Sequence, residues 1–249
     1  MWNGNAVAVR AIFLAISSVA IGGCEIGAAP RQAPEAAHDA RHLQLPNGRY
    51  QIDHTRNRVW LLTQAGVFVY DLSRPERIAV SLPDWLLVDT AYACPPDLAL
   101  GPGGEAVITS NILPTLWRID PDTLAVSVHP LVLDADTDKD VGFSGLAYSP
   151  QHGAFLAVSY AHGSLWRIDP LLKGAQKIPL SAPIPEACGL AVRSRSSQQA
   201  RGRPADLCVR TPRADWSVVF RPDWRAAHVS AASCTESSWP MNAVWLKGK

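Results

Sequence analysis

The sequence contains little charge of either sign and no hydrophobic run near its start that is long enough to span a membrane. Charged residues make up 18% of the 249 residues, and the formal net charge at pH 7 is +1. A nearly neutral chain has no overall field to attract nucleic acid or an anionic membrane surface. The uncharged stretch 11–23 is shorter than the roughly 20 residues that a transmembrane helix requires.

The sequence also lacks the short motifs of several enzyme classes. It contains no Gly-x-Ser-x-Gly elbow, no phosphate-binding P-loop and no dinucleotide fingerprint. His152 and His162 are expected in consecutive hairpin turns at opposite ends of a shared strand, so they cannot bind one metal ion together. The composition, 47% hydrophobic, is ordinary for a globular protein with a sizeable core.

The first residues predict export. Arg10 precedes the apolar stretch 11–23, and Ile21-Gly22-Gly23-Cys24 resembles the lipobox of bacterial lipoproteins. This resemblance implies a lipoprotein signal peptide over 1–23, acylation of Cys24 and, with Glu25 rather than aspartate next, the periplasmic face of the outer membrane. An ordinary secretory cleavage site is the alternative. The Ala- and Pro-rich segment 24–49 is interpreted as a tether, and a folded domain is expected from residue 50.

A six-residue motif recurs at constant spacing after the tether. Residues 116–121 and 165–170 both read LWRIDP, and residues 67–72, VFVYDL, form a weaker copy. Their aspartates, at positions 71, 120 and 169, are 49 residues apart. We expect each Asp to accept hydrogen bonds from the turn that it starts and each Trp to pack between repeats.

Each repeat alternates apolar and polar residues with the period of two that is typical of strands. The predicted strands are 50–53, 58–63, 66–71 and 77–82 in the first repeat, 97–100, 105–111, 115–120 and 124–131 in the second, and 145–148, 154–160, 164–169 and 175–180 in the third. A fourth repeat begins at 188–192. This pattern predicts an all-β, β-propeller-like fold with about three recognisable four-stranded blades and an atypical C-terminal segment.

Three segments carry a family resemblance: GPGGEAVITSN (101–111), GLAYSP (145–150) and LWRIDP. They resemble the repeats of NHL, YVTN and gluconolactonase (regucalcin-like) propellers over about residues 50–192. The resemblance implies the fold and leaves the function open, because this architecture includes lactonases, lyases, binding proteins and scaffolds.

Residues 193–249 depart from the repeat. They contain four of the nine tryptophans and clustered arginines, without the repeated motifs. Propellers close with typically four to eight blades, so three complete repeats leave the ring incomplete. One interpretation is that a truncation or frameshift replaced the ancestral sequence after about residue 192 and left a partial propeller; the other is that 193–249 form a divergent closing blade.

Ligands of propellers usually lie over the central funnel, where the loops 83–96, 131–144 and 181–188 are expected. Residues 134–140 begin like a calcium-binding loop but carry Lys139 and Gly145 where glycine and glutamate are required, so a solvated acidic loop is the alternative. The candidate metal ligands, with calcium as the candidate cofactor, are Asp134, Asp136, Asp138, Asp140 and Glu186.

Resemblance to gluconolactonases also implies an amide ligand directly before the Gly-Leu-Ala strand. Ser144 and Cys188 stand there instead, which argues against lactone hydrolysis. With the funnel carboxylate Asp97 they are the candidate ligand-binding residues. Cys94, Cys188, Cys208 and Cys234 allow three full disulfide pairings, and buried free thiols are expected for Cys94 and Cys188.

The sequence therefore favours an exported, lipid-anchored propeller that is a non-enzymatic binding or scaffold protein or a truncated relic. Its expected partners are the membrane, through the lipid, and a protein or small molecule at the blade faces. The alternative function is a periplasmic metal-dependent lactonase or related hydrolase that uses Asp140, Glu186 and Ser144 around a divalent cation.

Overall fold

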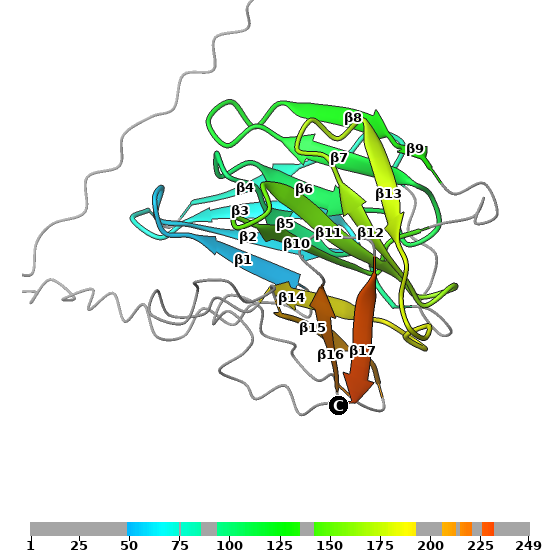
Figure 1. Ribbon diagram of the computed structural model, residues 1–249. Coiled ribbons are helices and arrows are strands. Elements are labelled where there is room, and N and C mark those ends of the chain that lie inside the picture. Colours follow the sequence, from blue (N-terminus) through cyan, green and yellow to red (C-terminus); the bar gives the residue numbers. More distant parts are fainter. Residues whose placement is uncertain are drawn as a thin grey trace, which may run out of the picture. The chain divides into compact units, whose positions relative to one another are not determined.

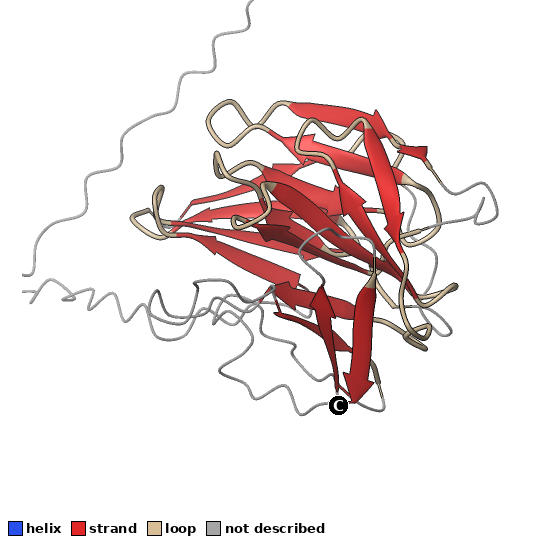
Figure 2. Ribbon diagram, in the orientation of Figure 1, coloured by secondary structure: helices blue, strands red, loops and turns tan. Residues whose placement is uncertain are grey.

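The computed structural model describes residues 49–74, 76–85, 94–134, 142–192, 206–212, 215–220 and 226–231. All of them belong to the unit Ala40–Lys249. Within these ranges every helix or strand is a β-strand (Figure 2), which confirms the all-β prediction. None of these ranges contains a helix with the length and apolar character needed to cross a membrane.

Four sheets follow one another along the chain, and each contains four consecutive antiparallel strands (Figure 1). Sheet 1 contains β1 (Arg49–Asp53), β2 (Arg58–Thr63), β3 (Gly66–Asp71) and β4 (Glu76–Val80). Sheet 2 contains β5 (Leu98–Leu100), β6 (Ala106–Thr109), β7 (Thr115–Ile119) and β8 (Val126–Pro130). Sheet 3 contains β10 (Gly145–Ser149), β11 (Ala154–Ser159), β12 (Ser164–Ile168) and β13 (Gly174–Ile178). Sheet 4 contains β14 (Gly189–Val192), β15 (Asp206–Arg210), β16 (Asp215–Phe220) and β17 (Ala227–Ala231).

The first strands of consecutive sheets contact one another, β1 with β5, β5 with β10 and β10 with β14. This is the blade arrangement of a β-propeller, as predicted. Sheet 4 extends the sequence-based expectation, because the repeat pattern predicts only its first strand. The three strands after residue 192 pair in order with β14, so the atypical segment supplies most of a fourth blade. Whether a frameshift produced this segment stays a hypothesis.

The chain covers the outer edges of sheets 3 and 4 as it passes from one sheet to the next. The short strand β9 (Val132–Leu133) leaves sheet 2 and pairs in parallel with β13. Leu180, which follows sheet 3, forms a parallel bridge with Ala227 of β17. Because an uncovered edge is a template for aggregation, these linkers both connect and protect the sheets.

Three hydrophobic cores fill the spaces between consecutive sheets. Trp60 and Trp117 are fully buried between sheets 1 and 2, and Trp166 is fully buried with Phe143 between sheets 2 and 3. Aliphatic side chains such as Leu190 form most of the core between sheets 3 and 4. The prediction that the tryptophans of the LWRIDP motifs pack between blades is confirmed, and burial of such large rings supplies much of the cohesion.

The repeated aspartates stabilise turns, as predicted. The Oδ1 atom of Asp71 accepts the N–H of Ser73 at 2.8 Å, and Oδ1 of Asp120 accepts the N–H of Thr123 at 2.8 Å. The Asp169 carboxylate accepts three backbone N–H groups, those of residues 171, 173 and 174. Hydrogen bonds from the N–H and hydroxyl of Thr123 lower the pKa of Asp120, because they favour its charged form.

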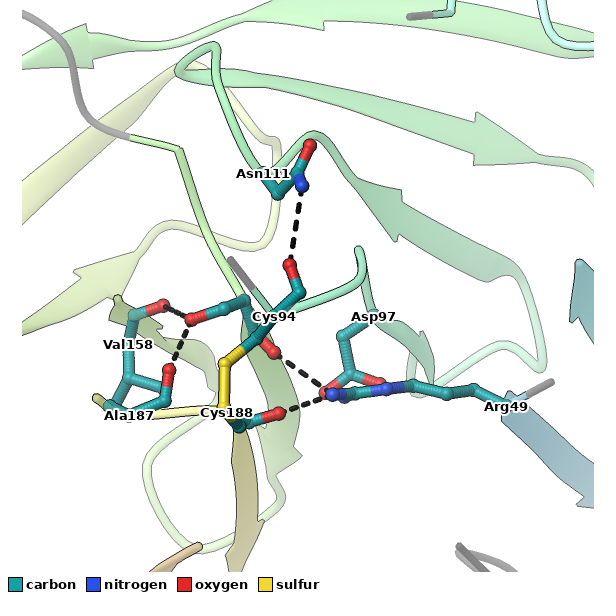
Figure 3. The surroundings of a disulfide bond; sticks show 8 residues. Arg49, Cys94, Asp97, Asn111, Val158, Ala187 and Cys188 are labelled. Carbon is teal, nitrogen blue, oxygen red and sulfur yellow. Dashed lines mark hydrogen bonds and ion pairs between the residues drawn. A yellow bond between two sulfur atoms is a disulfide. The ribbon is translucent and has the colours of Figure 1, made fainter. Parts of the chain in front are cut away.

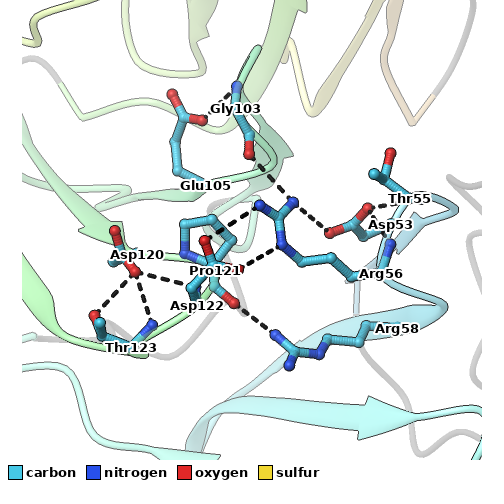
Figure 4. Close-up of polar contacts among 10 residues, drawn as sticks. All are labelled: Asp53, Thr55, Arg56, Arg58, Gly103, Glu105, Asp120, Pro121, Asp122 and Thr123. Atoms are coloured by element: carbon cyan, nitrogen blue, oxygen red, sulfur yellow. Dashed lines mark hydrogen bonds and ion pairs between the residues drawn. The ribbon is translucent and has the colours of Figure 1, made fainter.

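A polar cluster joins the turns of sheets 1 and 2 (Figure 4). Arg56, in the β1–β2 turn, contacts the carboxylates of Asp53 at 3.3 Å and Asp122 at 2.9 Å. Arg58 donates to the carbonyl of Pro121. Because the Arg56–Asp122 pair is exposed, it adds little to stability.

Candidate functional site

Four equivalent positions meet where the first strands of the sheets begin. Arg49 pairs with Leu62 of β2, and Gly145 and Gly189 occupy the same place in sheets 3 and 4. Asp97, directly before β5, has the same role in sheet 2, because its carbonyl accepts the N–H of Thr109 at 3.0 Å. The four positions therefore hold one arginine, one aspartate and two glycines.

The glycines allow the first strands of sheets 3 and 4 to approach closely. A Cβ atom at Gly145 would lie 2.9 Å from the carbonyl carbon of Gly189 and 2.7 Å from Cγ2 of Val158. Real Cβ atoms do not approach backbone atoms so closely, so only glycine fits here.

Arg49 reaches the other three sheets from the first residue of β1. Its guanidinium lies 2.5 Å from Oδ2 of Asp97, and Nη2 donates to the carbonyl of Ser144 at 3.2 Å and to the carbonyl of Cys188. Figure 3 shows this side chain extending toward the Cys188 backbone beside the Asp97 carboxylate. We call the set Arg49, Cys94, Asp97, Ser144 and Cys188 the hub.

Every oxygen of the Asp97 carboxylate is bonded within the protein. Oδ1 accepts the N–H of Leu98 at 2.8 Å, and Oδ2 accepts the N–H of Leu146 in sheet 3 at 2.8 Å as well as the Arg49 guanidinium. The side chains of Asp97 and Arg49 are only 9% and 13% exposed. Burial of this charge is tolerated because an opposite charge and two hydrogen-bond donors compensate it.

Ser144 links sheet 3 to the segment that leads into sheet 4. Its hydroxyl lies 2.5 Å from the carbonyl of Ala187 and 3.2 Å from the carbonyl of Val158. Both contacts are with hydrogen-bond acceptors, so the hydroxyl serves as a donor. Neither carbonyl can remove its proton, and the arrangement does not provide the base that an activated serine nucleophile needs.

Cys94 and Cys188 form a disulfide, which corrects the expectation of two buried free thiols. Their Cα atoms are 5.1 Å apart, within the usual range for the bond, although 94 residues separate them in the sequence. The physical reason is convergence: each precedes the first strand of its sheet, and those strands meet at the hub. Cys188 therefore has no thiol to offer a ligand, and Cys208 is also disulfide-bonded.

The described metal candidates are not brought together. Asp134 lies beside β9 on the outer edge of sheet 3, where its carboxylate accepts the N–H of Lys177 at 2.8 Å. Glu186 lies near the hub, in the segment before β14, with φ of +55°. Asp136, Asp138 and Asp140 lie outside the described residues, so the calcium loop stays a prediction.

The hub does not fit a hard divalent cation. Such a cation prefers several carboxylate and amide oxygens, whereas the hub has one carboxylate that already pairs with a guanidinium. A cation at Asp97 would meet the positive charge of Arg49. In the part of the chain that the structure describes, no three histidine, cysteine, aspartate or glutamate side chains are grouped as metal ligands.

The candidates Asp97, Ser144 and Cys188 thus do lie together, around an arginine that sequence reasoning assigned to the tether. Arg49 has no apolar alternation before it, so its strand could be recognised only from spacing. Positions 49, 97 and 145 are each 48 residues apart, and this spacing is the signal that places Arg49 in the first repeat.

Comparisons with known proteins support the fold. No family model matches the chain, and no curated protein matches it. Auxiliary nutrient binding proteins from Bacteroides ovatus and Bacteroides thetaiotaomicron are similar in structure, each with a TM-score of 0.51, at 13% and 12% identity. The alignments cover 77% and 74% of this chain but 48% and 42% of those proteins.

The GH74 xyloglucanase from Xanthomonas campestris is similar with a TM-score of 0.51 and 14% identity, over 73% of this chain and 30% of the enzyme. This chain spans less than half the length of these three proteins. They are propeller-type proteins, and similarity at this level of identity establishes the propeller fold alone.

Proposed function

We propose that the chain is an exported, lipid-anchored propeller that binds a ligand or partner and has no catalytic activity of its own. The observation that carries this proposal is that the polar and sulfur atoms of the hub are already bonded within the protein. The hub's carboxylate, guanidinium, hydroxyl and sulfur atoms are bonded to one another or to backbone carbonyls and N–H groups of other sheets. These bonds hold sheets together and leave recognition to the loops.

Two features support the binding or scaffold role. Three hydrophobic cores join the four sheets, which gives loops a rigid support and favours a working protein over a relic. Two of the structurally similar proteins are named as nutrient binding proteins. A small nutrient molecule bound by the loops at the hub end of the sheets is therefore the ligand class that we propose.

The lactonase alternative receives no support from the hub. It requires a divalent cation held by oxygen ligands, and the hub carboxylate faces a guanidinium instead. Lipid attachment at Cys24, and with it the outer-membrane address, rests on the sequence motif that precedes this cysteine.

The test of this proposal uses the full chain expressed in a bacterial host. The intact mass of the protein in the membrane fraction should show an acylated species that begins at Cys24, and a Cys24→Ala variant should be lost from that fraction.

Ligand binding is tested by thermal unfolding. The unfolding midpoint should rise with a soluble nutrient probe such as a xyloglucan oligosaccharide, because a ligand that binds the folded state raises the midpoint. Hydrolysis of gluconolactone that depends on calcium, manganese or zinc would overturn the proposal.

A further inference from the structure

We propose that the Cys94–Cys188 disulfide is a covalent latch that holds sheet 4 against the rest of the propeller. The bond joins the segment before β5 to the segment before β14, so it connects sheet 2 directly with sheet 4. Sheet 3 lies between them in the chain. The disulfide thus crosses the hub rather than joining neighbouring sheets.

The first observation is the uneven distribution of cores. Buried side chains join sheet 1 to sheet 2, sheet 2 to sheet 3, and sheet 3 to sheet 4. Among the described residues, no such core joins sheet 4 to sheet 1, which is the contact that ordinarily closes a propeller ring. Among these residues, sheets 1 and 4 each have one packed neighbour, whereas sheets 2 and 3 have two.

The second observation is the composition of the core between sheets 3 and 4. It consists of aliphatic side chains, with Trp216 only partly buried at its margin. The other two cores each contain fully buried tryptophan. Because cohesion follows buried apolar area, sheet 4 is held less strongly by packing than the other sheets.

The third observation is that Cys188 receives bonds from both sheet 1 and sheet 2. Cys188 carries the disulfide through its side chain and accepts the Arg49 guanidinium through its carbonyl. Its N–H donates to Arg210 of β15 at 2.7 Å, so the residue is built into sheet 4. Of these three bonds of Cys188, the disulfide is the covalent one, and breaking it leaves the two hydrogen bonds.

The redox step is a thiol–disulfide exchange. The thiols of Cys94 and Cys188 lose two protons and two electrons as the sulfur–sulfur bond forms, and an exchange partner with its own disulfide is reduced to two thiols. An oxidising compartment therefore closes the latch, and reducing conditions open it. The 94-residue separation makes the constraint large, because longer loops lose more entropy on closure.

Hydrogen exchange of the full chain tests the latch. In a C94A/C188A variant, backbone amides of β14–β17 should exchange about tenfold or more faster, while β2 and β11 keep their protection. The variant is preferable to a reductant alone because reduction also breaks the disulfide of Cys208. A C94S/C188S variant removes the same bond but places hydroxyl groups where C94A/C188A has methyl groups. Equal changes of exchange in the two variants assign the effect to the loss of the bond rather than to the replacing side chain.

Two results would overturn the latch: unchanged exchange in all four sheets, or an equal loss of protection in all of them. If the variants do not fold, folded protein that carries Cys208→Ala, and so lacks the second disulfide, is treated with a phosphine reductant. Alkylation of Cys188 is then followed together with exchange. Faster exchange confined to sheet 4 as Cys188 becomes alkylated supports the latch. Alkylation of Cys188 without a change in sheet 4 contradicts it.

Discussion

Replacement of Arg49 by methionine tests whether the hub bonds stabilise the propeller. The change keeps an unbranched side chain but removes the ion pair with Asp97 and the hydrogen bonds to the carbonyls of Ser144 and Cys188. Removing one member of a fully buried pair costs about 3–5 kcal/mol. Asp97 retains the N–H groups of Leu98 and Leu146, so we expect a loss at the lower end, about 3 kcal/mol.

A double-mutant cycle separates the ion pair from packing. R49M/D97N removes both charges, and we expect it to recover about half of the R49M loss, because no unpaired charge remains buried. Urea unfolding of the disulfide-intact chain measures the free energy of unfolding of R49M, D97N and R49M/D97N. Asp122→Asn, which weakens the exposed contact with Arg56 and leaves Arg56 paired with Asp53, is the control and should move the midpoint far less. The reasoning would be refuted by an R49M variant as stable as wild type. It would also be refuted if the losses of unfolding free energy in R49M and D97N summed to the loss in R49M/D97N.

Two further predictions concern the close contact at the hub and the response to acid. Gly145→Ala places a Cβ against the Gly189 backbone and should lower the free energy of unfolding by about 2–3 kcal/mol. The control, Gly153→Ala, has open space but φ of +56° and should lower it by about 1 kcal/mol. Equal losses of unfolding free energy in urea would contradict the close approach. Burial, and secondarily the charge of Arg167, lower the pKa of His152 in the folded protein. As the pH drops below 6.5, His152 is therefore protonated more in the unfolded state than in the folded state, and the free energy of unfolding falls. Thermal midpoints between pH 5 and 8 should depend less on pH in His152→Asn than in the control His162→Asn, and identical profiles would contradict this.

Much of the fold follows from the repeat. The predicted strand 58–63 coincides with β2, and 154–160 exceeds β11 by one residue, because alternation and turn residues mark both ends. The repeat does not predict the strands of sheet 4 after residue 192, because these strands follow no repeated motif. Strand β9 has two residues and forms only because the edge of β13 is near, so no local pattern indicates it.

The site was predictable in part for the same reason. Asp97, Ser144 and Cys188 precede recognisable first strands, and the repeat alone places them at one end of their sheets. The partner that unites them, Arg49, follows a segment without periodicity. The disulfide depends on how closely the strands converge, which is a property of the packed sheets rather than of any segment.

The arrangement of the hub also bears on how such a chain evolves a function. Equivalent positions of the repeat meet at one place and hold one arginine, one aspartate and two glycines. Arg49 and Asp97 compensate each other's charge there, and Gly145 allows the close approach of the Gly189 backbone. Replacement of Arg49 or Asp97 alone leaves the other as an unpaired buried charge. Changes that alter ligand preference are therefore expected in the loops around the hub, and the hub itself is expected to vary only in compensated pairs.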